Sequence, residues 1–141
     1  MKIFGSYNTK SKSSSLRHQV AKLFLDRSNG CLCVNKRLLE LLEIGGKETA
    51  FIYFIEDDKG KFGICKTLDE EKGIPLYWYK TDTRARMFNS TIVEYIMNKF
   101  KLTNIHTSYH IVFYQLPVTI EKLVVYQIRE ITPYQRHMVK R

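Results

Sequence analysis

The stretch VNKRLLELL, Val34–Leu42, has a pattern of apolar and polar residues that recurs in FNSTIVEYI, Phe88–Ile96. The apolar positions match one for one, and Asn and Glu recur at the same two places. The Asn side chain can accept a hydrogen bond from an otherwise unsatisfied amide of a first helical turn, and apolar residues follow at helical spacing. Both stretches therefore predict a short amphipathic helix, and their likeness indicates an internal duplication.

Segments with the composition of β-strands flank each predicted helix in the same order. Around the first helix they are joined by turns rich in Gly, Asn, Asp and Ser, and Gly45–Gly46 is expected to end that helix. The strands expected around the first helix are 22–26, 31–34, 50–56 and 62–68. Those expected around the second helix are 76–80, 84–88, 109–115 and 122–128.

One strand–strand–helix–strand–strand unit is too small to enclose a core, because its sheet would keep a bare apolar face. A second copy would cover that face. The sequence therefore predicts an α+β fold in which two pseudo-repeated β-β-α-β-β units form one barrel- or sandwich-like domain. The expected divisions are a basic Ser/Lys-rich arm 1–19, a first unit 20–68, a linker 69–75, a second unit 76–131 and a basic tail 132–141.

The net charge of +9 is concentrated at the two ends of the chain. Residues 1–27 carry +5, residues 28–80 carry −1 and residues 81–141 carry +5. Basic ends around a neutral middle are typical of proteins with a polyanionic partner, most often nucleic acid. Ordinary solvated surface charge is the alternative interpretation.

The order of features over residues 22–67 resembles the AbrB/SpoVT family. Asp26, Gly30, the strand CLCV, the helix LLELLEIGG and the hairpin FIYFIEDDKGKFGICK follow one another as they do in that family. The resemblance implies a swapped-hairpin barrel, here with two tandem copies in one chain, and a DNA-binding role. Asn35 and Asn89 stand where the family usually has Pro, and the Gly-Arg pair of its turn is absent.

The resemblance also implies that cations on the first strand of each unit and its turn contact DNA. By position these are Lys22 and Arg27 in the first unit, and Lys80, Arg84 and Arg86 in the second. Arginine suits this task because its planar fork grips a phosphate or the edge of guanine. Within the arm, Lys10, Lys12 and Arg17 could follow the phosphate backbone. Alternatively, Arg84 and Arg86 are only the solvent face of an amphipathic strand.

Tyr77, Trp78 and Tyr79 form an aromatic run on a predicted strand. Such a run serves most often as core or as a protein interface. Beside Lys80 it could instead stack on single-stranded bases.

No motif for catalysis is recognisable. The sequence lacks a Gly-rich phosphate loop, a nucleophile elbow and a HExxH zinc motif. The three cysteines, Cys31, Cys33 and Cys65, favour reduced, buried thiols over a metal site. We therefore expect no catalytic residue, no metal, no cofactor and no small-molecule substrate.

Two functions remain. The first is a non-enzymatic DNA-binding module of the transcription-regulator kind, working in the cytoplasm. The alternative is a structural or assembly subunit of a larger complex such as a phage virion, which would use its arms and the aromatic run as protein interfaces. The expected partners are nucleic acid or other protein subunits, with an oligomer possible and no membrane segment, since no apolar run is long enough to span one.

Overall fold

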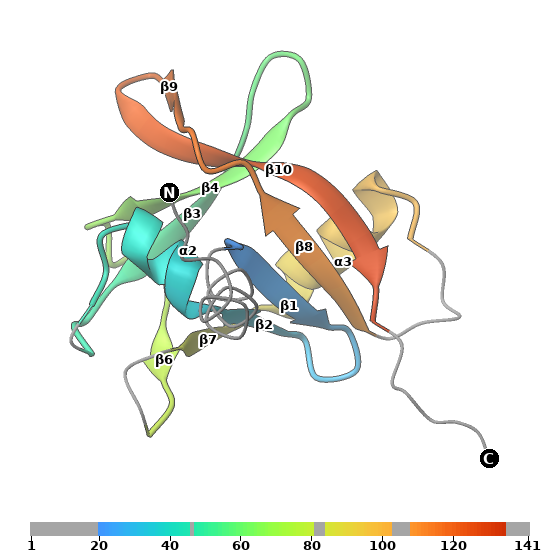
Figure 1. Cartoon of the computed structure of the whole chain (residues 1–141), viewed down its shortest axis with the longest axis horizontal. Helices are drawn as coiled ribbons and strands as arrows, with labels where there is room; N and C mark the ends of the chain where they lie inside the picture. Colours follow the sequence, from blue (N-terminus) through green and yellow to red (C-terminus); the bar gives the residue numbers. More distant parts are fainter. Residues whose placement is uncertain (1–19, 46, 81–83, 103–107, 135–141) are drawn as a thin grey trace, which may run out of the picture.

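The computed structural model describes residues 20–45, 47–80, 84–102 and 108–134. The protein is mostly β: within these described residues, nine antiparallel strands form a nearly closed barrel, accompanied by two short helices (Figure 1). In chain order the elements are β1 (Lys22–Asp26), β2 (Cys31–Val34), α2 (Lys36–Leu41), β3 (Phe51–Glu56), β4 (Phe62–Thr67), β5 (Ile74–Pro75), β6 (Tyr77–Trp78), β7 (Ala85–Phe88), α3 (Ser90–Lys99), β8 (Ser108–Phe113), β9 (Val118–Ile120) and β10 (Leu123–Pro133).

Hairpins from the two halves of the chain alternate around the barrel. The strand order is β5-β3-β4-β10-β8-β1-β2-β7-β6, and β9 pairs with β10 beside this path. The hairpin β1–β2 thus lies between β8 and β7, and the hairpin β8–β10 lies between β1 and β4. Every pairing is antiparallel, so neighbouring hairpins cover one another's otherwise open edges.

One short segment draws the two edges of the sheet together. Ile74–Pro75 pairs with β3, and Tyr77–Trp78 pairs with β7. Leu76, between them, donates its amide hydrogen to the carbonyl of Ala50 at 3.1 Å and is buried. The chain therefore passes from one edge of the sheet to the other within five residues, which nearly closes the barrel.

The core lies inside the barrel and follows the period-two alternation of its strands. Leu23 and Leu25 of β1 are fully buried, as are Leu32 of β2 and Met87 of β7. The described residues include no buried polar or charged residue. The longest strand, β10, starts in the hairpin with β9 that projects from the body and then crosses the barrel between β4 and β8 (Figure 1).

The two helices begin and end in the same way. Asn35 and Asn89 are the N-caps, and their side-chain oxygens accept from the amides of Leu38 and Ile92 respectively. At the C-terminal end of α2, the amide of Ile44 donates to the carbonyl of Leu39. At the same place in α3, the amide of Leu102 donates to the carbonyl of Met97. Both ends are thus Schellman motifs, with α3 the longer helix.

The expectation that Gly45–Gly46 ends the first helix is wrong. The helix stops at Leu41, and the residue with left-handed geometry is Glu43, at φ 60°. Ile44 is buried in the core, and its amide donates to the carbonyl of Leu39 in the Schellman motif. Packing of Ile44 therefore ends the helix before the chain reaches the glycines.

Most predicted strands are confirmed, but three details differ. The strand expected at 76–80 is ordered as a strand only over Tyr77–Trp78. Two short strands, β5 and β9, had no expected counterpart, because two or three paired residues carry no periodicity to recognise. β10 extends to Pro133, beyond the expected end at residue 128. Neither helix of the described residues is long and apolar enough to cross a bilayer.

Candidate nucleic-acid interface

The outer surface of β6, β7, β2, β1 and β8 gathers cations and aromatic rings. Because alternate residues of these strands fill the core, the intervening ones point outward on one face. We name this surface the cation–aromatic face. It comprises Lys22, Phe24, Cys31, Cys33, Tyr77, Tyr79, Arg84, Arg86, Phe88 and His110, together with Tyr134 just after β10.

Strand register places these side chains in rows across the face. Tyr77 is opposite Arg86, Arg86 is opposite Cys33, Cys33 is opposite Phe24, and Phe24 is opposite His110. Directly opposed residues of an antiparallel pair lie about 5 Å apart. The row therefore brings residues 24, 33, 77, 86 and 110 side by side although they are far apart in sequence.

At one end of the face two arginines stack on one tyrosine. The guanidinium carbons of Arg84 and Arg86 lie 4.5 and 4.7 Å from the ring centroid of Tyr79. Arg86 also lies 5.2 Å from the ring of Phe88. Burial and a hydrogen bond with Cys33 raise the pKa of the Tyr79 hydroxyl, so it stays neutral at physiological pH. Such cation–π contacts hold the guanidinium planes in place without neutralising their charge.

At the other end, three rings form an edge-to-face cluster. The centroids of Phe24 and His110 are 5.3 Å apart, those of Phe24 and Tyr134 are 5.3 Å apart, and those of His110 and Tyr134 are 5.4 Å apart. Burial, with a smaller effect of the nearby Lys22 ammonium, lowers the pKa of His110. The imidazole is therefore neutral at physiological pH and acts as a third aromatic ring.

A hollow of about 420 Å³ lies between these two groups. Two cations, Lys22 and Arg84, line it, and none of the described residues that line it is acidic. Asp26, farther along β1, is occupied by its own turn, where it accepts from Ser28 and Asn29. The hollow thus offers positive charge and ring surface together. The residues around it are Lys22, Phe24, Cys33, Asn35, Arg84, His110 and Tyr134.

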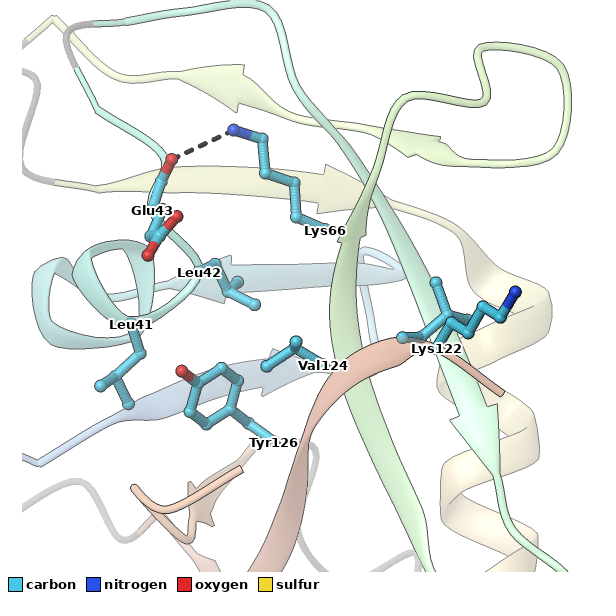
Figure 2. A pocket seen from close by; sticks show the side chains of 8 residues that line it. Leu41, Leu42, Glu43, Lys66, Lys122, Val124 and Tyr126 are labelled. Atoms are coloured by element: carbon cyan, nitrogen blue, oxygen red, sulfur yellow. Dashed lines mark hydrogen bonds between the residues drawn. The ribbon is translucent and has the colours of Figure 1, made fainter. Parts of the chain in front are cut away.

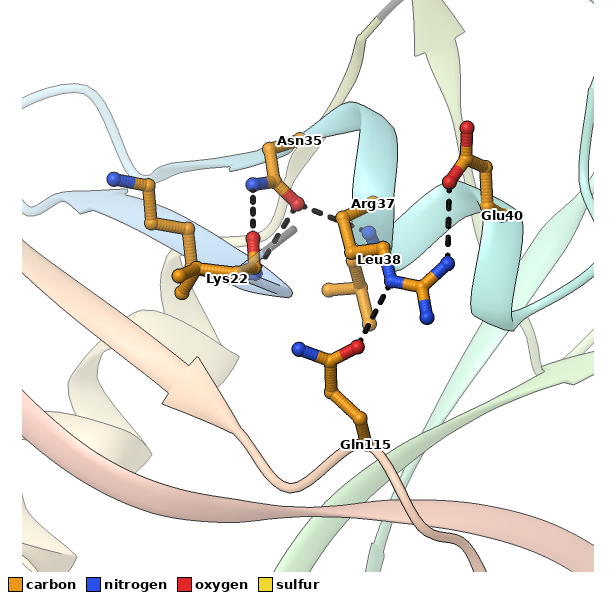
Figure 3. Close-up of polar contacts among 7 residues, drawn as sticks. Lys22, Asn35, Arg37, Leu38, Glu40 and Gln115 are labelled. Carbon is orange, nitrogen blue, oxygen red and sulfur yellow. Dashed lines mark hydrogen bonds and ion pairs between the residues drawn. The ribbon is translucent and has the colours of Figure 1, made fainter. Parts of the chain in front are cut away.

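The first residue of β1 is anchored by the cap of α2 (Figure 3). The side-chain oxygen of Asn35 accepts from the amide of Lys22 at 3.1 Å and from the amide of Leu38 at 3.0 Å. Its side-chain nitrogen donates to the carbonyl of Val20 at 2.6 Å. In Figure 3 the Lys22 ammonium points away from this network. The cap therefore fixes the backbone of Lys22, while the charged side chain of Lys22 lines the hollow.

Not all of the predicted nucleic-acid contacts meet on this face. Lys22, Arg84 and Arg86 do. Arg27 instead lies in the β1–β2 turn and forms a two-pronged ion pair with Glu94 of α3, at 2.9 and 3.2 Å. This pair lowers the pKa of Glu94. Lys80 is exposed in the loop after β6. Lys10, Lys12 and Arg17 lie outside the described residues.

The aromatic run divides between surface and core. Tyr77 is exposed and its ring lies 5.9 Å from that of Phe88, while Tyr79 supports the arginines. Trp78 faces the other way, packs against the core and donates its indole N–H to the carbonyl of Glu48 at 2.8 Å. The period-two alternation of the strand is the physical reason for this division.

Two further hollows are differently built. One of about 300 Å³ lies between α2 and the start of β10, and its polar side includes Lys66, which donates to the carbonyl of Glu43 at 3.1 Å (Figure 2). Another of about 550 Å³ borders the β3–β4 turn and mixes carboxylates such as Asp58 with amines such as Lys61. Both hollows have carboxylates among their lining residues, whereas none of the described residues that line the hollow of the cation–aromatic face is acidic.

The thiols and carboxylates do not form a metal site in the described part of the chain. There, no three His, Cys, Asp or Glu side chains lie close enough to hold an ion. Burial and the neighbouring Cys33 raise the pKa of Cys31, which keeps that thiol protonated. Cys65 is buried on β4, away from the face.

Sequence reasoning missed Phe24, Cys33, His110 and Tyr134 as members of the face. The alternation in KLFLD and YHIVF already indicates that Phe24 and His110 lie on the outer sides of their strands. Their contact, however, depends on the pairing of β1 with β8, which no local pattern encodes. Comparisons with known protein families, with curated proteins and with solved structures found no match to this chain.

Proposed function

We propose that this chain is a non-enzymatic DNA-binding protein of the transcription-regulator kind, and that the cation–aromatic face is its binding surface. The observation that carries the proposal is the convergence of Lys22, Arg84 and Arg86 on one outer face whose hollow has no acidic lining residue among those described. Arg84 is exposed, and its guanidinium carbon lies over the ring of Tyr79. Phosphate oxygens are the natural partners of such ordered guanidinium groups.

We also infer that the barrel is a duplicated β-β-α-β-β unit, with copies at 20–68 and 76–131, of the swapped-hairpin kind that the AbrB/SpoVT resemblance implies. Two observations support this. The helices share an Asn N-cap and a Schellman end. Each hairpin of one half also has strands of the other half as neighbours. In this arrangement β1–β2 and β6–β7 are equivalent hairpins, and their adjacency joins Lys22 with Arg84 and Arg86 in one surface.

The proposal is tested by fluorescence anisotropy of a labelled duplex across a salt series. We expect binding whose logarithm falls linearly with the logarithm of salt concentration, because bound cations displace counterions from the phosphates. Arg84→Ala with Arg86→Ala should reduce the magnitude of that slope by about two and weaken binding by about tenfold or more at low salt. Lys59→Ala with Lys61→Ala is the matched control.

The control removes the same charge from two exposed residues in the β3–β4 turn, away from the cation–aromatic face. Equal losses in the two double variants would show that only net charge matters and would refute the assignment of the face. Flat titrations of the unaltered protein at low salt, with the duplex and with one of its separated strands, would refute DNA binding itself.

A second candidate function is favoured by a different surface. The hairpin of β9 and β10 projects from the barrel, and near it Leu116 and Val124 are 85% and 53% exposed. β9 pairs with β10 and is an open edge of the sheet. Exposed apolar side chains beside an open edge are typical of a protein–protein contact. An assembly subunit would use this hairpin, and Leu116→Ser with Val124→Ser should then abolish self-association seen by analytical ultracentrifugation.

A further inference from the structure

We propose that the hollow of the cation–aromatic face receives an unpaired base, so that the nucleic acid bound here is single-stranded. The inference rests on the proposed function and specifies the form of its ligand. In this arrangement the base lies against Phe24 and Tyr134, while Lys22, Arg84 and Arg86 hold the neighbouring phosphates.

The chemistry of the hollow favours a base over a phosphate alone. Three of its lining side chains, Phe24, His110 and Tyr134, present ring surface, and Cys33 adds a small, weakly polar thiol. Aromatic rings gain little from a phosphate but stack well on the face of any base. The hollow of about 420 Å³ lies within the range of ligand-sized cavities, roughly 300–1,000 Å³.

A duplex would leave this ring surface without a partner. Its bases are stacked on one another, and it presents only phosphates, sugars and the edges of bases to a protein. In a single strand a base can leave the stack and lie on an aromatic side chain or on a guanidinium plane. Arg84, which is exposed and lines the hollow, offers such a guanidinium.

Charge is distributed as a single strand requires. Lys22 begins β1, which also carries Phe24, and Arg84 and Arg86 lie two strands away on or next to β7, whereas the other two rings lie beyond β1, on β8 and just after β10. A backbone that crosses the strands from β7 would meet this positive charge first and then the rings of the hollow. His110, whose pKa burial and Lys22 lower, adds ring surface there without adding charge.

The test compares a labelled oligothymidylate, which cannot pair with itself, with a hairpin duplex carrying the same number of phosphates. We expect the single strand to bind more tightly to the unaltered protein. Tyr134→Leu should weaken single-strand binding by roughly tenfold, because stacking contributes that much per base, and should leave duplex binding unchanged. Oligouridylate in parallel distinguishes RNA from DNA as the source of the base, and tight binding of either supports the inference.

Tyr95→Leu is the matched control, since Tyr95 is exposed to a similar extent, 44% against 40%, but lies on α3. A second measurement uses 2-aminopurine within the oligothymidylate, whose fluorescence should be quenched by the unaltered protein and less by Tyr134→Leu. If the duplex binds as well as the single strand, or if the two tyrosine variants behave alike, the inference is overturned. DNA binding would still stand in that case if Arg84→Ala with Arg86→Ala weakened it.

Discussion

Replacing Asn35 by alanine should destabilise the protein far more than the same change at Asn89. Both residues are N-caps and occupy equivalent places in the repeated pattern. Asn35 makes three hydrogen bonds, to the amides of Leu38 and Lys22 and to the carbonyl of Val20 (Figure 3). For Asn89 the described bond is the cap itself, from the amide of Ile92 at 3.0 Å.

The magnitudes follow from these contacts. Loss of a helix N-cap costs about 1 kcal/mol. Each of the two additional partly buried bonds of Asn35 contributes about 1 kcal/mol more, since the alanine leaves both backbone groups without their partner. We therefore expect a loss of about 3 kcal/mol for Asn35→Ala and about 1 kcal/mol for Asn89→Ala. For a domain of this size the melting temperature should fall by about 10 °C and about 3 °C respectively.

Equilibrium unfolding in urea, followed by circular dichroism, measures both losses under identical conditions. The m-values should stay the same, since neither change alters the surface exposed on unfolding. Equal losses for the two variants would refute the reasoning, because they would show that the bonds to Lys22 and Val20 add nothing to the cap. Asn35 also holds the start of β1, from which Lys22 projects into the hollow, so Asn35→Ala should disturb the cation–aromatic face as well.

Two more predictions concern stability. Gly63→Ala should destabilise by about 2 kcal/mol, because a Cβ there would lie 2.6 Å from Val125 and 2.7 Å from the backbone of β10, whereas Gly45→Ala, with nothing within 4 Å, should be nearly neutral in the same urea assay; similar effects would contradict the close packing of β4 on β10. His110 has a lowered pKa, so the folded state binds its proton less readily than the unfolded state, and the free energy of unfolding should fall as pH drops below about 6.5. His110→Phe should remove that part of the pH dependence, and an unchanged profile would contradict the burial of the imidazole beside Lys22.

Local signals in the sequence were sufficient for most elements. The caps Asn35 and Asn89 and the turns at 27–30 and 57–61 mark where helices and hairpins begin and reverse. These signals act over a few residues, through one side chain and the nearest backbone groups, so they are legible without the rest of the fold. The end of α2 was misjudged because core packing of Ile44 outweighs the permissive geometry of Gly45.

The candidate site was only partly predictable, because local signals do not report contacts between segments that are distant in sequence. The alternation of RARMF places Arg84 and Arg86 on one side of a strand, as the sequence implies. The sequence also grouped Arg27 with them, whereas the fold turns Arg27 toward α3 and the Glu94 carboxylate. An ion pair between residues so distant in sequence depends on how α3 lies across the β1–β2 turn.

By itself, the sequence determined the periodicities of this protein: which of the longer segments form strands, which form helices, and which side of each faces the core. Only the tertiary structure decided the order of the hairpins around the barrel. It brought β8 beside β1 and β7 beside β2, and so joined Phe24 with His110 and Cys33 with Arg86. Strand order depends on which edges close most favourably over a shared core. That is a property of all the strands together, and no short stretch of residues carries it.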